Sequence, residues 1–267
     1  MTVSASTESR LNAVDDALQR AGALSERTAT DLFAIADAID SSAQLRRTLT
    51  DPAIGTGARQ GVAARLFQGK VDPTALNVLT QSLAQPWPSG RALAAALDRQ
   101  GVRAVLILGQ QANRLDEIEG ALFRFGRIVD ADRPLRAALS DSSTPVAKRQ
   151  QLVRDLLTGK VPAEVVTLAE RAVAARHRTF DLTVEQYLSV SAALRRRTVA
   201  TVRVARPLSP EQEARLAGAL TRQVGRAVNV MVVVDPALIG GVKVELGDEL
   251  IDGSVAGRLQ DADRQLA

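Results

Sequence analysis

Few side chains in this sequence have the type and spacing that chemistry requires. Ser254 stands at an expected helix start with Arg258 one turn later, a pair that could hold a phosphate or simply cap the helix. The single histidine, His177, lies at an expected helix end, where a partial positive charge suits the helix dipole. The three arginines at 195–197 fit a solvated helix end, or a contact with an acidic partner, RNA or lipid.

None of these groups forms a recognisable active site. The sequence has no phosphate-binding loop of the form GxxxxGK[ST], and its acidic pairs, Asp235-Pro236 and Asp252-Gly253, are typical of turns. With no cysteine there is no thiolate ligand or nucleophile, and a single histidine excludes a histidine-rich metal cluster. We therefore predict a non-catalytic protein with no catalytic residues, no metal site and no cofactor.

Composition indicates a globular protein that is not embedded in a membrane. Of its 267 residues, 46% are hydrophobic and 24% are charged. No apolar run approaches the ~20 residues of a membrane span, and the N-terminus lacks the features of a secretory signal, which predicts a cytoplasmic location.

The pI of about 10.1 keeps a nucleic-acid-associated helical adaptor as an alternative. The formal net charge is only +4, however, and the basic excess is confined to residues 91–178, with 15 basic and 10 acidic side chains. Aromatic residues are only 3% of the chain, which argues against stacking on single-stranded nucleic acid.

The chain contains an internal repeat. A shift of 90 residues aligns 31–84 with 121–174 without a gap, and 14 of the 54 positions are identical. Apolar residues recur at intervals of three and four in both copies, which predicts helices. The expected ranges are 8–21, 26–41, 43–50, 57–68 and 73–84 in the first copy, and 91–114, 116–130, 132–140, 145–158 and 162–176 in the second. Each set predicts an antiparallel helical bundle.

Prolines and glycine at 85–90 mark a boundary between the copies, and we expect Trp87 there to be a packing residue. After a helix near 181–197, β-rich runs occupy 198–204, 228–234, 242–246 and 249–251. A helix is expected from Ser209-Pro210 to about residue 224, and a last one after Ser254. The fold class is thus mainly α, with two repeated bundles and a small mixed sheet with helices, divided at 1–90, 91–178 and 179–267.

The C-terminal third resembles a known signature. The run from Asp235-Pro236 through Gly240-Gly241, followed by Asp252-Gly253-Ser254, is similar to the C-terminal pattern of the delta subunit of F-type ATP synthase, called OSCP in mitochondria. Leu208 to Gln212 resembles the start of a helix in the same family, and the resemblance runs back to about residue 99. It implies a stator subunit of F1Fo ATP synthase, needed to couple proton transport to ATP synthesis.

The resemblance also implies partners and a place. The family's helical domain holds the N-terminal helices of the alpha subunits on the catalytic head, and its C-terminal domain grips the b-type stalk, on the cytoplasmic side of the cell membrane. The alpha contact is expected on the first and fifth helices of the bundle, although the same residues could fill its core. They are Val102, Val105, Leu106, Gly109, Val165, Leu168 and Ala169.

Residues 1–90 lie in front of the family's usual length, a form that resembles actinobacterial members. Gly55, Gly57 and Gly61 are expected to interrupt the helix at 57–68 in this copy. We therefore expect the first copy to bind or brace the stalk rather than to bind alpha.

Overall fold

The structure, a computed structural model, describes residues 5–21, 23–141, 143–175, 179–196, 199–224, 228–235, 238, 241–246 and 249–254. The chain divides into two compact units, Met1–Ser191 and Ala192–Ala267. Both helical repeats lie in the first unit. Among the described residues, no helix has the length and apolar character needed to cross a membrane.

The helices follow the expected ranges, and most of their ends fall within two residues of the prediction. The first repeat comprises α1 (Ala5–Arg20), α2 (Glu26–Ser41), α3 (Ala43–Thr50), α4 (Thr56–Phe67) and α5 (Pro73–Ser82). α6 (Gly90–Gln111) follows, and then α7 (Leu115–Ala131), α8 (Arg133–Ser140), α9 (Val146–Leu157), α10 (Ala163–Ala174) and α11 (Phe180–Arg196).

Local sequence signals set where these helices begin and end. Ser25 and Thr28 form a reciprocal capping box at the start of α2. The Asp72 carboxylate accepts from two backbone N–H groups at the start of α5, with Pro73 in its first turn. Gly69 and Gly159, which occupy equivalent positions of the repeats, have φ of 75° and 77° after α4 and α9, a left-handed conformation that glycine adopts readily.

The predicted interruption of the helix at 57–68 in the first repeat is wrong. α4 runs from Thr56 to Phe67 through Gly57 and Gly61, and Gly55 stands before it as the N-cap residue. A glycine inside a helix costs only about 1 kcal/mol relative to alanine, a cost that tertiary packing can offset. Trp87 is buried and its indole N–H donates to the Ser82 carbonyl at 2.7 Å, which confirms it as a packing residue.

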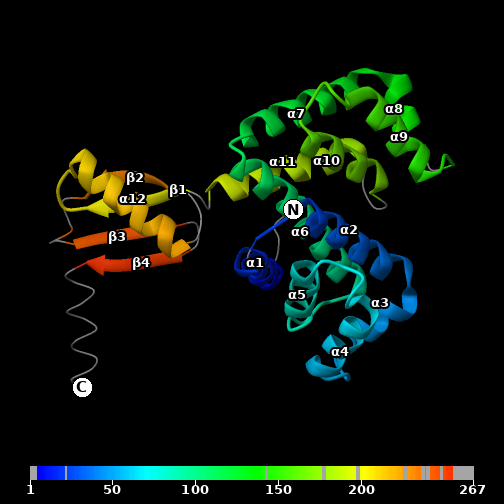
Figure 1. Cartoon of the computed structure of the whole chain (residues 1–267), viewed down its shortest axis with the longest axis horizontal. Helices are drawn as coiled ribbons and strands as arrows, with labels where there is room; N and C mark the ends of the chain where they lie inside the picture. Colours follow the sequence, from blue (N-terminus) through cyan, green and yellow to red (C-terminus); the bar gives the residue numbers. More distant parts are fainter. Residues whose placement is uncertain are drawn as a thin grey trace. The chain divides into compact units, whose positions relative to one another are not determined.

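α6 is shared by the two repeats. Under the 90-residue shift it aligns with both α1 and α11, so it is the last helix of the first repeat and the first helix of the second. Buried side chains recur around it from Leu93 to Leu106, which marks a helix surrounded by others. Figure 1 shows α6 between the α1–α5 group and the α7–α11 group.

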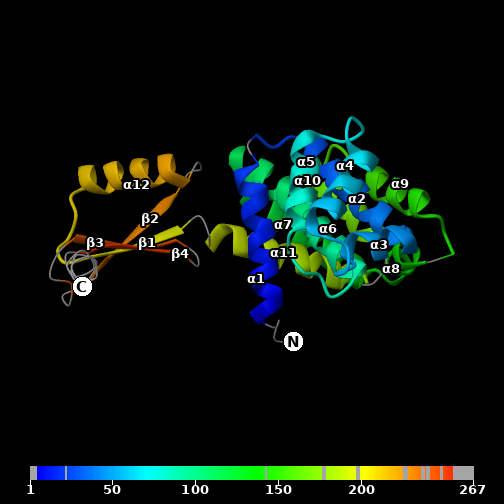
Figure 2. The same cartoon turned by 90° about the horizontal axis from the view of Figure 1, so that it is seen from below.

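The second unit is a four-stranded mixed sheet with a helix on one face. Its strands are β1 (Val199–Val204), β2 (Asn229–Val234), β3 (Gly241–Leu246) and β4 (Glu249–Ser254), in the order β2-β1-β3-β4. β1 and β2 are parallel and joined by α12 (Pro210–Val224), whereas β3 is antiparallel to β1 and β4. Figure 2 shows α12 over one face of the sheet.

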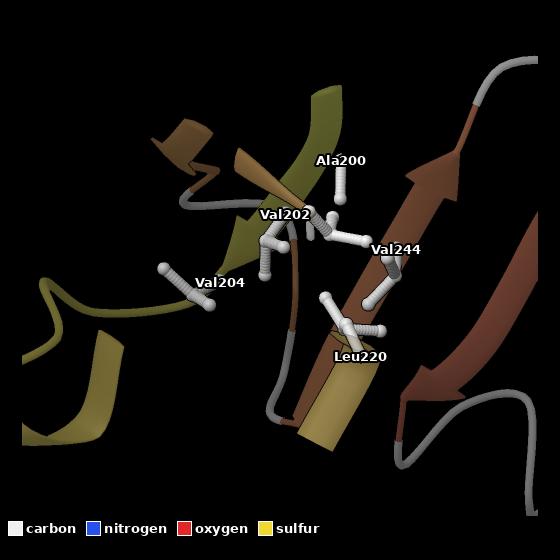
Figure 3. Packing of buried hydrophobic residues seen from close by; sticks show 6 residues of the cluster. Ala200, Val202, Val204, Leu220 and Val244 are labelled. Carbon is white, nitrogen blue, oxygen red and sulfur yellow. The ribbon is translucent and has the colours of Figure 1, made fainter. Parts of the chain in front are cut away.

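The core of this unit lies between α12 and the sheet. Ala200, Val202 and Val204 alternate along β1 toward Leu220 of α12 and Val244 of β3 (Figure 3), as expected for a strand with one covered face.

The interpretation of Asp252-Gly253 as a turn is wrong, because both residues lie in β4 and pair with Lys243 and Val242. The strand continues to Ser254, so Ser254 ends β4. The helix expected after it lies outside the described residues.

Candidate interaction surfaces

The seven residues that the sequence resemblance assigned to a partner lie in the interior of the helical unit. Six of them, Val102, Val105, Leu106, Val165, Leu168 and Ala169, are almost fully buried, and Gly109 is buried with them. A Cβ at Gly109 would meet the end of the Ile118 side chain. The seven residues therefore pack α6 and α10 within this chain.

Partly exposed apolar side chains are present on the same two helices. Ile107 and Leu108 of α6 and Val166 of α10 are each half-buried. Nearby, Arg114, just after α6, forms an ion pair with Glu164 of α10 at 2.5 Å. α6 and α10 thus combine a packed interior with an outer surface that is partly apolar.

A charged cluster joins the two repeats. Arg171 of α10 donates from Nη1 and Nη2 to the Asp37 carboxylate of α2 at 2.7 and 3.0 Å. Its Nε bonds Asp98 of α6, and its guanidinium lies 4.8 Å from the centre of the Phe33 ring, a cation–π distance. One side chain of the second repeat therefore holds α2, in the first repeat, and the shared helix α6.

The electrostatics of this cluster follow from its burial. Burial raises the pKa of Asp98, and the charge and hydrogen bond of Arg171 lower it by less. Burial opposes the charge on Arg171, but Asp37 and Asp98 more than offset this and raise its pKa. Burial also raises the pKa of Tyr187, which stays neutral. The cluster lines a cavity of about 150 Å³, and the rest of the wall combines five alanines with Asp40, Arg91, Thr183 and Gln186.

A second charged cluster lies deeper, between α1 and α6. Asp15 of α1 is fully buried, and it forms ion pairs with Arg99 and with the fully buried Arg103, the latter at 3.3 Å. Gln100 also donates to Asp15 at 2.8 Å. This cluster holds α1 against the shared helix.

Among the described residues of the C-terminal unit, no helix covers the face of the sheet opposite α12, which we call the open face. Met231, which is 55% exposed, and Val233 lie on it from the edge strand β2. Thr201 and Arg203 of β1 are their register neighbours, and Arg203 donates to Glu245 of β3 at 3.3 Å. Met231 and Val233 are therefore exposed apolar side chains on an edge strand, next to the Arg203–Glu245 ion pair.

The residues of the predicted C-terminal signature are only partly described. The Asp235 N–H donates to the Val204 carbonyl at 2.8 Å at the end of β2. Gly241, with φ of 84°, begins β3, and Asp252, Gly253 and Ser254 end β4. Pro236 and Gly240 lie outside the described residues. The described members therefore lie at strand ends, where they shape the sheet.

The other predicted candidates contribute little to a site. His177, Arg197 and Arg258 lie outside the described residues, and Arg195 is exposed at the end of α11. In the part of the chain that the structure describes, no group of histidine and carboxylate side chains could hold a metal ion.

Sequence reasoning missed the Arg171 cluster and the open sheet face. The sheet face had a signal, since β2 is apolar at every position from Val230 to Val234 while α12 covers only one of its faces. The Arg171 cluster had no such signal in the sequence. The equivalent residue of the first repeat is Gln81, so the repeat did not mark Arg171 as special.

Comparisons with known proteins agree with the resemblance. The family model described as "ATP synthase delta (OSCP) subunit" matches residues 99–266. "ATP synthase subunit delta" of Kineococcus radiotolerans is 40% identical over 255 residues, which cover 95% of this chain and 92% of that protein. The protein of the same name from Cutibacterium acnes is 38% identical and covers 100% of both chains, and that from Streptomyces avermitilis is 38% identical with 94% and 95% covered.

Among solved structures, a chain of the Toxoplasma gondii mitochondrial ATP synthase hexamer matches at 18% identity. It covers 62% of this chain and 94% of that chain with a TM-score of 0.31, too low to carry an argument. The alignment with the Cutibacterium protein includes the first 90 residues, so the duplicated front is shared with that relative. The chain belongs to the ATP synthase delta (OSCP) family, the non-catalytic stator subunits of F1Fo ATP synthase.

Proposed function

We propose that this stator subunit carries load between the catalytic head and the peripheral stalk through two separate surfaces. The helical unit binds the N-terminal helices of the alpha subunits, and the C-terminal unit binds the b-type stalk. Residues 91–178 and 179–267 are then the two domains that bind alpha and the stalk, and residues 1–90 are an additional helical bundle. The protein lies on the cytoplasmic side of the cell membrane, peripherally and only through the complex.

The observation that carries this proposal is the open sheet face in a unit separate from the helices. Met231 and Val233 leave apolar surface exposed on an edge strand, a place where an added helix or strand can bury it. A load-bearing contact needs no chemistry, in agreement with a family whose members are non-catalytic. The alternative of a nucleic-acid adaptor finds no support in these comparisons.

For the alpha contact, the buried residues of α6 and α10 supply rigidity and the half-buried ones supply surface. Val105, Leu168 and their buried neighbours hold the two helices together. In this proposal, an amphipathic helix of the alpha subunit contacts the half-buried Ile107, Leu108 and Val166 of these two helices.

The first repeat, in this proposal, braces the stalk rather than binding alpha. Support comes from the Arg171 cluster and the Asp15 cluster, which fix α2 and α1 to the second repeat and to α6. A force on the first repeat therefore reaches α6 through charge-assisted hydrogen bonds and packing.

Separate binding assays with the tagged full-length chain test this division. One assay uses soluble F1 and the other uses the soluble part of the b-type stalk. We expect Val166→Asp to weaken binding of F1 only, and the double variant Met231→Asp/Val233→Asp to weaken binding of the stalk only. Leu66→Asp is the matched control, because Leu66 is an exposed aliphatic residue of α4 outside both surfaces.

Circular dichroism of each variant checks that it is folded. The proposal fails if the β2 double variant binds the stalk as the wild type does. It also fails if that variant loses F1 while keeping the stalk.

A further inference from the structure

The outer face of α7 carries large side chains that no described residue of the helical unit covers. Phe123 and Ile128 are each 56% exposed, although they belong to a helix whose opposite face, including Leu122 and Phe125, is buried. Arg124 and Arg127 lie between them on the same face and are exposed. We call these four residues, Phe123, Arg124, Arg127 and Ile128, the α7 face.

The repeat shows what such a face does when it is covered. Phe33 is the equivalent of Phe123 and is only 8% exposed. Its ring packs against α6 at Gly101, where a Cβ would collide with it, and the Arg171 guanidinium covers it from α10. In the first repeat, therefore, this face is an interface with other helices.

In the first repeat, a carboxylate one helical turn after Phe33 binds the Arg171 guanidinium that covers the ring. Asp37, four residues after Phe33, receives the Arg171 guanidinium. In the second repeat the equivalent of Asp37 is Arg127, so the aromatic residue is kept and the charge is reversed. The complement of the α7 face is a helix that offers a carboxylate to Arg127 and a small residue to Phe123.

The charges within the face are both positive, and the acidic side chains of α7 flank it. Asp116 and Glu117 lie in the first turn and Glu119 lies one turn before Phe123, while Asp130 contacts Arg127 only at 3.9 Å and with half of its side chain exposed. Such an exposed pair contributes little and exchanges readily for a better one. Arg124 adds a second positive charge one turn before Ile128.

We propose that the α7 face docks an acidic, amphipathic helix of another subunit of the ATP synthase, in the way that α2 packs against α6 and α10. This proposal depends on the proposed function in one respect only, namely that the docked helix comes from another subunit of the ATP synthase. It is distinct from the α6/α10 surface and from the sheet face, so it gives the second repeat a further attachment point. The apolar anchors supply affinity, and the two arginines select an acidic partner.

Photo-crosslinking in the assembled, purified complex identifies the occupant. Benzoylphenylalanine replaces Phe123, and the cross-linked peptide is sequenced by mass spectrometry. We expect one peptide from another subunit, with carboxylates on one side of a helical apolar stripe. A cross-link to lipid, to a second copy of this chain or to a basic segment would overturn the proposal, as would the absence of any protein cross-link.

A matched pair of double variants measures the contribution of the face. Arg127→Glu/Ile128→Ala changes an adjacent arginine and aliphatic residue on α7, and Arg65→Glu/Leu66→Ala makes the same change at an exposed site on α4. Using the cross-linked peptide as a synthetic probe, we expect the first variant to bind about tenfold more weakly than the wild type. The second should bind as the wild type does. Equal affinities of the two variants would contradict the proposal.

The outcome is separable from that of the proposed function. If the α7 variant binds the peptide normally while Val166→Asp and the β2 double variant lose F1 and the stalk, only the α7 proposal fails. If the α7 variant loses the peptide while the other two retain both partners, only the proposed division of labour fails.

Discussion

The two helical repeats have nearly the same helices but differ in what covers their second helix. α2 packs against α6 and Arg171 of α10, whereas the corresponding face of α7 is open, so that Phe33 is buried and Phe123 is exposed. One helix, α6, belongs to both repeats, and Arg171 of the second repeat covers Phe33 of the first. The duplication therefore leaves one face of α7 without an internal partner among the described residues.

The largest expected effect comes from removing the clamp between the repeats. Arg171→Met leaves the Asp37 and Asp98 carboxylates close together without the guanidinium that neutralises them. We expect the free energy of unfolding to fall by about 2–4 kcal/mol, between the values for exposed and fully buried pairs, as measured by denaturant unfolding.

The control for this change is Arg154→Ala, which breaks an ion pair with Glu170 within the second repeat. The Arg154 side chain is more exposed than that of Arg171, so its loss should cost less than about 1 kcal/mol. Equal costs for Arg154→Ala and Arg171→Met would show that Arg171 is not a clamp.

The second effect concerns the close packing of α2 on α6. Gly101→Ala places a Cβ against the Phe33 ring, which must shift, and we expect a loss of about 1–3 kcal/mol. Gly61→Ala on α4 meets no atom within 4 Å and should instead stabilise the chain by about 0.5–1 kcal/mol. Thermal unfolding of both variants distinguishes a steric effect from a general effect of glycine.

The third effect is a dependence on pH at Asp98. Because burial raises the pKa of Asp98 above its ordinary value of 3.8, the folded chain takes up a proton there more readily than the unfolded chain. The stability of the wild type should therefore decrease relative to Asp98→Asn as pH rises from 3.8 through the raised pKa. Unfolding of both proteins over this range measures the difference, and an increase with pH would contradict the burial argument.

The smallest effect lies in the turns between the third and fourth elements of each repeat. Asp141 accepts from the Ser143 and Thr144 hydroxyls and from the Ser143 N–H, bonds that lower its pKa to about 2. This stabilisation is present above the ordinary value of 3.8 and is lost as pH falls from there toward 2. The advantage of the wild type over Asp141→Asn should therefore shrink across that window.

The equivalent turn of the first repeat lacks these hydroxyls. Asp51 accepts from the Ala53 N–H at 2.9 Å, but Ala53 and Ile54 stand where the second repeat has Ser143 and Thr144. Acid titration of unfolding in the wild type and in Asp141→Asn makes the measurement. An advantage of the wild type that stays constant between pH 3.8 and about 2 would contradict the argument.

Helix positions could be predicted from the sequence because the signals that set them are local. Apolar spacing, Asp72 before Pro73, and the glycines at 69 and 159 are all visible in the sequence. What covers a helix depends on distant residues, so the 90-residue spacing of the expected helices at 8–21, 91–114 and 181–197 did not by itself show that α6 packs against both copies.

The predicted site residues show the same limit. Val102, Leu168 and their neighbours have the spacing of an apolar helical face, but that spacing is the same whether the face meets a partner or the core. The structure places them in the core. Asp252-Gly253 has the composition of a turn, yet pairing with β3 places it in a strand, since strand pairing can override local preference.

Proton pumping by reconstituted membranes tests the central claim most directly. Membranes stripped of F1 and of this chain are mixed with F1, with or without the purified chain, and ATP-driven proton uptake is measured. A stator subunit predicts that F1 hydrolyses ATP in both samples, but that protons are pumped only when the chain is present. Equal pumping without the chain would contradict the claim that it links the head to the stalk.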